Sequence, residues 1–395
     1  MRLHLVAGKP TDSVSHGILP AAARLGVDVI VLTDQPEAHL NSGGHRPADV
    51  VGCDVHDVRA LIAAIAVLPA PDGLLSNSDH LQAQTALAAA YFGLPGKDWR
   101  AALRAKNKAL MRRRLAEADE PPVTAVELAP GVGVPDGLPY PLVLKPRDGV
   151  ASEDVVLVRD RAELCSRYAE IGARRPGQAL LAEEYLQGEL HTLETLSDGA
   201  TTWVLGGFRT TLSAPPYFVE ERLTWDAARP RGVVRPVEHA LAALGAGFGA
   251  CHTEFVWDCR GAPRIIEVND RLIGDHCDFL LADLLQAPLF EHVLRIHLGE
   301  PLGKTPPQAR GHAIADYVVA GASGLLTAAP PPANLTGDDG VALVYRPLRA
   351  VGDRVEITGT NRDYLGVIRA VGPGHREVEH AVHRFRAQNR WQLTS

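Results

Sequence analysis

The segment 251–269 holds the residues whose types and spacing point most directly to chemistry. Its two apolar runs flank a stretch of turn-forming residues, which is the composition of a β-hairpin. Side chains alternate between faces along a strand, so Glu267 and Asn269 share a face. If the turn centres between residues 260 and 261, Glu254 lies opposite Glu267. Like charges at that spacing, about 5 Å, destabilise a strand pair.

Two carboxylates and an amide oxygen on one face therefore need a cation between them. An all-oxygen set with few protein ligands suits Mg²⁺ whose remaining ligands are phosphate oxygens. The alternative is a solvated acidic face without an ion, and the apolar neighbours argue against a fully wet surface; they are Phe255, Val256, Trp257, Ile265 and Ile266. The pattern predicts a magnesium site formed by Glu254, Glu267 and Asn269.

Lys145 stands at the end of an apolar strand predicted over 141–145. An unpaired buried ammonium is strongly unfavourable, so this group must meet an anion or water. A nucleotide phosphate is the functional partner, and a structural salt bridge is the alternative. The loop that follows contains Gly149 and Ser152, and such loops can surround a phosphate with backbone N–H groups.

Two further segments contain residues that suit a nucleotide. Lys108 stands in a helix predicted over 106–118, which presents its ammonium either to a site or to solvent. The segment 180–189 combines a strand end, whose free backbone groups can contact an adenine edge, with Glu189, which can accept two ribose hydroxyls. An ordinary strand end explains the same residues.

In their order along the chain, these motifs resemble those of the ATP-grasp family, over roughly residues 1–300. The resemblance implies a Rossmann-like N-terminal domain, a small lid domain and a larger C-terminal domain of antiparallel sheet, with ATP held between the last two. It implies ATP and one or two Mg²⁺ ions as cofactors. The implied contacts are Lys108, Lys145, Gly149 and Ser152 for phosphates, Glu183 and Leu186 for adenine, Glu189 for ribose, and Glu254, Glu267 and Asn269 for magnesium.

Arg271 matches the family's arginine after the metal strand, where the resemblance implies that it stabilises an acyl phosphate together with Lys145. The run from His252 to Asp275 looks most like the branch that joins amino acids or small carboxylates to amines, as in dipeptide and siderophore biosynthesis. An ATP-dependent carboxylate–amine ligase is the implied activity. The alternatives are a kinase-like phosphotransferase on a small metabolite and a non-catalytic nucleotide-binding protein.

The substrates stay open at this point. Candidates for carboxylate recognition are Arg209, Arg222, Arg271 and His276, and Glu220 or Asp275 suits an amine. Apart from Arg271, the sequence favours an ordinary surface or ion-pair residue over a substrate contact for each of them. A polycarboxylate such as citrate suits several arginines, whereas an amino acid suits a pair of opposite charges.

The loop 147–154 departs from the family pattern in one respect. Ala151 and Asp154 occupy positions that are often glycine, so their side chains are expected to stiffen the lid. Glu153 and Asp154 are also expected near phosphate, where like charge disfavours binding.

The fold that positions these residues is predicted as α/β followed by α+β. Residues 1–105 alternate strands at 3–7, 27–33 and 72–75 with helices at 17–25, 57–68 and 79–91, which indicates a parallel Rossmann-like sheet. No GxGxxG motif follows the first strand, so the sequence does not indicate a dinucleotide site there. The segment 76–79 is interpreted as the N-cap of the third helix.

Residues 106–188 are predicted as a linker helix and lid, and 189–395 as the large domain with a β-rich tail. In the large domain we expect hairpins over 189–212 and 251–269, and helices over 237–248 and 277–298. The tail from about residue 311 is predicted to be mostly β, with a loop or insertion at 327–340.

Composition limits the class of protein. The 395 residues carry a formal net charge of −7 without a basic block, which argues against nucleic acid or an anionic membrane as the main partner. Five cysteines without CxxC spacing indicate reduced thiols. With no signal peptide or long apolar run, a cytoplasmic location is expected. Small-molecule substrates are the expected partners, and a homodimer is left open.

Overall fold

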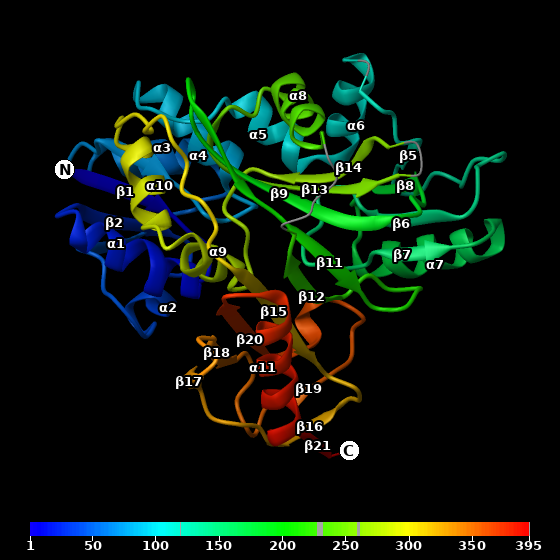
Figure 1. Cartoon of the computed structure of the whole chain (residues 1–395). Coiled ribbons are helices and arrows are strands. Elements are labelled where there is room, and N and C mark those ends of the chain that lie inside the picture. The colour runs from blue at the N-terminus through cyan, green and yellow to red at the C-terminus, as the bar shows by residue number, and fades with distance from the viewer. Residues whose placement is uncertain (119, 227–231, 259–260, 395) are drawn as a thin grey trace.

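The computed structural model describes residues 1–118, 120–226, 232–258 and 261–394. Within these ranges the strands form four sheets. Figure 1 shows the N-terminal part on one side of a long antiparallel sheet, a smaller sheet with one helix on the other side, and the C-terminal residues at one end. The mixed α/β class and the large antiparallel sheet agree with the sequence prediction.

The N-terminal part contains a parallel sheet in the order β3-β2-β1-β4, as predicted. Its strands are β1 (Arg2–Val6), β2 (Asp28–Thr33), β3 (Asp49–Gly52) and β4 (Gly73–Leu75). A π-helix (Ser13–Ile18) continues into α1 (Leu19–Arg24), and the other helices are α2 (Pro36–Leu40), α3 (Val58–Ala66) and α4 (Gln82–Tyr91). Apolar strand residues of β1 and β2 are fully buried, because helices cover both faces of a parallel sheet.

Two consecutive helices replace the single helix predicted over 106–118. They are α5 (Trp99–Lys106) and α6 (Lys108–Glu117). Asn107 between them has extended backbone angles, and its side-chain oxygen accepts a hydrogen bond from the Leu110 backbone N–H. An N-cap of this kind starts a new helix. Lys108 is consequently the first residue of α6.

The smaller sheet has the order β5-β8-β6-β7 and is antiparallel. Its strands are β5 (Ala125–Leu128), β6 (Leu142–Pro146), β7 (Val156–Val158) and β8 (Leu180–Glu184), and α7 (Arg161–Arg174) packs on it. We call the residues 147–154, which join β6 to β7, the lid loop.

The large sheet has the order β14-β13-β9-β11-β12-β15-β20-β18-β17, with β10 paired to β9. Its first part comprises β9 (Glu189–Asp198), β10 (Thr202–Gly206), β11 (Phe208–Leu212), β12 (Glu220–Trp225), β13 (Phe248–Trp257) and β14 (Pro263–Asn269). The helix α8 (Val234–Leu244) packs against the β13/β14 end. The tail adds β15 (His312–Val319), β17 (Ala333–Thr336), β18 (Ala342–Pro347) and β20 (Tyr364–Gly372) to the same sheet.

The tail is mostly β, as predicted, but two details differ. The helix α11 (His375–Gln388) was not predicted, and β17 lies inside the segment 327–340 that was interpreted as a loop. A short sheet pairs β16 (Gly324–Ala328) with β19 (Arg354–Val355) and β21 (Gln392–Thr394), and a 3₁₀ turn spans Asn361–Asp363. The helix predicted over 277–298 is two helices, α9 (Cys277–Leu285) and α10 (Leu289–His297), because Gln286 adopts a left-handed conformation before Pro288.

Two general expectations can be compared with the structure. Four of the cysteines are free thiols, namely Cys53, Cys165, Cys251 and Cys277, whereas Cys259 lies outside the described residues. In the described part of the chain, none of the helices combines the length and the apolar character that crossing a membrane requires.

Candidate functional site

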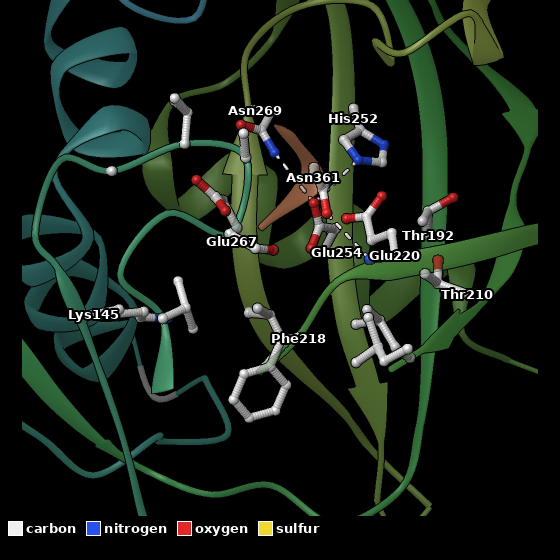
Figure 2. A pocket seen from close by; sticks show the side chains of 18 of the residues that line it. Lys145, Thr192, Thr210, Phe218, Glu220, His252, Glu254, Glu267, Asn269 and Asn361 are labelled. Atoms are coloured by element: carbon white, nitrogen blue, oxygen red, sulfur yellow. Dashed lines mark hydrogen bonds and ion pairs between the residues drawn. The ribbon is translucent and has the colours of Figure 1, made fainter. Parts of the chain in front are cut away.

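A cavity of about 370 Å³ lies where the smaller sheet, the large sheet and α6 meet. Its wall includes the lid loop, the ends of β6 and β8, and the cavity face of β9, β11, β12, β13 and β14. The segment 271–277, which leads from β14 into α9, also lines the cavity, and we call the part lined by Glu220, Arg271, Asp275 and Tyr317 its inner end. Figure 2 shows acidic and amide side chains on the β13/β14 wall, with Lys145 approaching from the opposite side.

The hairpin of β13 and β14 carries the acidic wall, and we call it the acidic hairpin. Glu254 pairs opposite Glu267, and His252 pairs opposite Asn269, so the predicted register is confirmed. The register shifts after Glu254, where the strand pair has a bulge. Asn269 Nδ2 lies 3.5 Å from Glu254 Oε1. The predicted turn at residues 260 and 261 falls partly outside the described residues.

Cationic side chains offset the carboxylates of the acidic hairpin. Lys108 Nζ lies 2.7 Å from Glu267 Oε1 and donates to the Gly149 carbonyl at 3.1 Å. His252 lies between two carboxylates, with Nδ1 2.8 Å from Glu194 and Nε2 3.2 Å from Glu254. Burial alone lowers the pKa of His252, but Glu194 and Glu254 raise it to about 10. The like-charge problem recognised in the sequence is therefore balanced by an ammonium and an imidazolium.

Lys145 is buried at the opposite wall and has a carboxylate partner. Its Nζ lies 2.5 Å from Glu183 Oε2, and Glu183 also pairs with Arg112 at 2.7 Å. Burial raises the pKa of Glu183, yet Arg112 and Lys145 lower it to about 2. The structural salt bridge considered for Lys145 is present, and the same residue lines the cavity. Arg112 was not identified from the sequence.

The lid loop contributes Gly149 and Ser152 to the cavity wall. Ala151, Ser152 and Asp154 have φ angles of 54°, 56° and 55°, a left-handed conformation that disfavours side chains. The loop thus adopts a backbone suited to glycine without having glycine at these positions.

The acidic residues of the lid loop do not line the cavity. Glu153 and Asp154 pair with Arg175, Asp154 also pairs with Arg174 at 2.7 Å, and Glu153 also pairs with Arg362 from the C-terminal tail. The expected repulsion of phosphate by these carboxylates is therefore wrong for this conformation, because arginines outside the cavity neutralise them.

Asp79 belongs to the site rather than to a helix cap. The helix α4 begins at Gln82 without a side-chain cap, so the N-cap interpretation of 76–79 was wrong. Asp79 instead lies 2.7 Å from Lys106 Nζ and 3.8 Å from Arg271 Nε, and it lines the cavity. The sequence signal, a polar run after a parallel strand, suits both roles.

The inner end of the cavity holds Glu220, Asp275, Arg271 and Tyr317. The Glu220 carboxylate makes no hydrogen bond or ion pair within the described part of the chain. Burial, followed by the like charges of Glu254 and Asp275, raises the pKa of Glu220 to about 8. Figure 2 shows its carboxylate beside that of Glu254. A cation bound here would satisfy an otherwise unpaired acid.

Four of the residues singled out in the sequence lie away from the cavity wall. Glu189 and Arg209 pair with each other at 3.3 Å and are both exposed. Arg222 pairs with Asp316 at 2.8 Å and Glu379 at 2.7 Å, and His276 lies 3.2 Å from Asp12. Their roles in ribose or substrate binding stay predictions. The other candidates line the cavity, including Leu186 and Glu183.

The donor set of the acidic hairpin fits a hard cation. In the described ranges no cluster of three or more His, Cys, Asp or Glu side chains has metal-binding geometry. Glu254, Glu267 and Asn269 supply two carboxylates and one amide from one sheet face, which is an incomplete all-oxygen set. Such a set suits Mg²⁺ that keeps other oxygen ligands.

Comparisons with known proteins agree with this geometry. Residues 105–275 match the family model described as ATP-grasp domain. The whole chain aligns with 84% of "Uncharacterized protein y4rH" from Sinorhizobium fredii at 28% identity over 414 residues. A phosphoribosylamine–glycine ligase from Phenylobacterium zucineum is 27% identical over 255 residues, which cover 59% of this chain and 57% of that protein.

The similarity of the fold extends over the whole chain. The crystal structure of L-amino acid ligase from Bacillus licheniformis has a TM-score of 0.82 at 22% identity, covering 100% of this chain and 99% of that one. The chain therefore shares its fold with that structure over its whole length, beyond the segment that the family model matches.

Proposed function

Because residues 105–275 form an ATP-grasp domain, we propose that this chain is an ATP-dependent ligase that joins a carboxylate to an amine through an acyl phosphate. ATP and Mg²⁺ are the cofactors. The observation that supports the assignment most is the facing pair Glu254 and Glu267, with Asn269 beside them, across one cavity from Lys145. An all-oxygen wall opposite buried cations suits a metal–triphosphate.

Each side of the cavity has a separate task in this proposal. Glu254, Glu267 and Asn269 would hold Mg²⁺, which neutralises charge on the phosphates. Lys108 and Lys145 would contact phosphate oxygens, and Gly149 and Ser152 would offer them backbone groups of the lid loop. Glu183 and Leu186 at the β8 end would hold the adenine ring. Closure of the lid loop keeps water away from the reactive acyl phosphate.

The reaction divides into two transfers. An oxygen of the substrate carboxylate attacks the γ-phosphorus, and ADP leaves. The nitrogen of a neutral amine then attacks the acyl carbon, and inorganic phosphate leaves as the amide forms. Arg271, which is 3.8 Å from Asp79 and lines the inner end, stabilises the negative charge on the acyl group in both steps.

We infer that the acid component is an amino acid rather than a polycarboxylate. Glu220 and Asp275 bring two acidic side chains to the inner end, and Arg271 is a cation available there. A bound ammonium would favour the ionised form of Glu220, whose pKa is raised to about 8 without a partner. A second or third carboxylate on the substrate would meet like charge instead.

The test is a pairwise screen of amino acids and polycarboxylates for ADP release, with mass detection of products. We expect ADP release only when two amino acids are present, and a product whose mass equals their sum less one water. ADP release with one substrate and a stable phosphorylated product would indicate the kinase-like alternative instead. A nucleotide that binds without any turnover across the screen would indicate the non-catalytic alternative. The siderophore pathway resemblance stays a prediction.

Glu220→Gln tests the inner end separately. We expect kcat/KM for the acid component to fall about tenfold to a hundredfold, because a charged hydrogen bond is lost, while the affinity for ATP is unchanged. Glu221→Gln, which changes a neighbouring exposed acid on β12, is the control. A change in the Mg²⁺ dependence, with unchanged KM for the amino acid, would show that Glu220 serves the metal instead.

A further inference from the structure

A second cavity, of about 750 Å³, lies at the far end of α9. Its wall comes from the C-terminal end of α9, the residues that precede β15, and parts of β18 and β20. It shares none of its lining residues with the cavity described above. In Figure 1 this region lies where α9 meets the C-terminal part of the large sheet.

The strand register explains how a charged side chain reaches this cavity. Val344 pairs opposite Arg369, and Ala342 pairs opposite Val371, so these four side chains share one face of the β18/β20 pair. All four line the cavity. Three of them are apolar, and the fourth is an arginine within an otherwise apolar stretch of β20.

Arg369 is buried without a matching acceptor. The Arg369 residue is 8% exposed, and neither its Nε nor its Nη1 atom has a hydrogen-bond acceptor within the described ranges. The guanidinium lies over the Phe279 ring of α9, with Cζ 5.1 Å from the ring centroid. The nearest carboxylate, that of Asp283, lies 3.8 Å from Nη1 and is 57% exposed.

Such an arrangement is unfavourable unless something else pairs with the guanidinium. Buried polar groups are nearly always hydrogen-bonded, and a buried charge needs a close partner. A solvated carboxylate at 3.8 Å supplies little of that stabilisation. Burial lowers the pKa of Arg369, an effect that the Asp283 and Asp278 carboxylates oppose.

A second arginine stands at the rim of the same cavity. Arg310 is exposed, and no carboxylate of the described residues lies within ion-pair distance of its side chain. Its backbone N–H donates to the Leu284 carbonyl at 3.2 Å, which fixes this segment to α9. Two guanidinium groups and one carboxylate give the cavity an excess of positive charge.

We propose that this cavity binds a small organic anion, a carboxylate or a phosphate ester, through Arg369 with Arg310 at its rim. The planar guanidinium matches either oxyanion with two parallel hydrogen bonds. The apolar face of Val344 and Val371 contacts the organic part of the ligand. The site is separate from the proposed ligase reaction, so it does not depend on that assignment.

The experiment uses the full chain in a buffer free of phosphate and carboxylates, with inorganic phosphate and succinate as probes. Thermal unfolding and isothermal titration are followed for the wild type, Arg369→Gln and Arg310→Gln, with the exposed Arg113→Gln on α6 as the control. We expect each effective probe to raise the unfolding midpoint of the wild type and of the control by about 3 °C near a hundredfold excess over Kd.

In Arg369→Gln the affinity should fall at least about tenfold, because the buried donor is lost. A response to phosphate alone assigns a phosphate ester, and a response to succinate alone assigns a carboxylate. The proposal is overturned if the wild type responds to neither probe or if Arg369→Gln retains full affinity. Should Arg369→Gln fail to fold, Arg310→Gln decides, since an exposed substitution leaves the core intact, and full affinity in that variant overturns the proposal.

Discussion

The acidic hairpin and the lid loop face the same cavity but are held in different ways. The hairpin carries its charged side chains on paired strands whose register fixes them, with Lys108 and His252 as buried partners. The lid loop has three left-handed residues that are not glycine, and it is restrained by partly exposed ion pairs to Arg174, Arg175 and Arg362. Positioning in the first depends on the backbone, and in the second on side chains that solvent can reach.

This difference indicates that the acidic hairpin and the lid loop have different tasks in the cavity. A rigid wall suits groups that must hold a metal within a few tenths of an ångström. A wall held by partly exposed ion pairs opens at a lower cost than one held by strand pairing, because ion pairs that water reaches contribute about 1 kcal/mol or less each. The following substitutions test that contrast.

The largest effect is expected from Glu267→Gln in the acidic hairpin. Loss of one carboxylate ligand should lower ADP release at least about a hundredfold, since a metal contact supplies several kcal/mol to the transition state. Turnover at saturating amino acids and a Mg²⁺ titration measure it. Glu300→Gln, at a half-buried acid that follows α10 and pairs with Arg295 away from the cavity, should retain full activity. Wild-type turnover in Glu267→Gln would remove the metal assignment.

Glu183→Gln should affect stability more than any lid-loop change. Its pKa of about 2 in the folded protein, against 4.5 ordinarily, means that Glu183 stabilises the fold above pH 4.5 and that this contribution disappears as the pH falls to about 2. The shift corresponds to about 3 kcal/mol. Denaturant unfolding between pH 7 and 2 should show this loss for the wild type, and a flatter dependence for Glu183→Gln.

The matched control for Glu183 is Glu127→Gln, because Glu127 lies on the neighbouring strand β5 and is exposed. Its stability should follow the wild-type pH dependence. An identical pH dependence in Glu183→Gln would show that the buried Lys145–Glu183–Arg112 cluster does not stabilise the lid.

Arg362→Gln breaks the ion pair between the tail and Glu153 of the lid loop. We expect a modest effect, with the Kd for ATP rising about fivefold or less, because the pair is partly exposed. Titration with ATP and Mg²⁺ measures it, and the exposed Arg59→Gln in α3 is the control. A loss as large as that of Glu267→Gln would mean that the lid loop is as strongly fixed as the hairpin.

Ala151→Gly should give the smallest effect and the opposite sign. Glycine adopts a φ of 54° without steric cost, so the free energy of unfolding should rise by about 1 kcal/mol or less. Thermal unfolding measures it, with Ala129→Gly, at a residue with ordinary backbone angles, as the control. A destabilised Ala151→Gly would indicate that the left-handed conformation is not strained in the ligand-free lid.

The sequence predicted the acidic hairpin well because strand alternation and one turn determine its register. The partners of its charged residues were harder to predict: Glu194 is 58 residues from His252 and Lys108 is 159 residues from Glu267, and only the fold brings each pair together. Arg112, four residues beyond Lys108 in α6, gave no signal of its own. Its guanidinium reaches Glu183 on β8 from α6, which contacts the neighbouring strand β5.

Other parts of the sequence contained information on the structure that the predictions did not use. The buried residues of α11, Val378, Ala381, Val382 and Phe385, follow helical spacing that was overlooked in a tail rich in β-formers. The segment 76–79 was ambiguous in itself, since the residues that cap helices also line sites at strand ends. The ion pairs of Glu153 and Asp154 depend on the folded path of the lid loop, which local composition does not determine.

The pairing of β12 with β15 has a consequence for any attempt to shorten this chain. The residues after 310 continue the large sheet. Removing them would leave the backbone N–H and C=O groups of β12 that face β15 without hydrogen-bond partners, so β12 would become an exposed edge strand. Strands with that property recruit other strands, and intermolecular aggregation follows. A fragment that stops at the boundary of the family match would therefore be expected to precipitate, even though every proposed magnesium ligand remains in it.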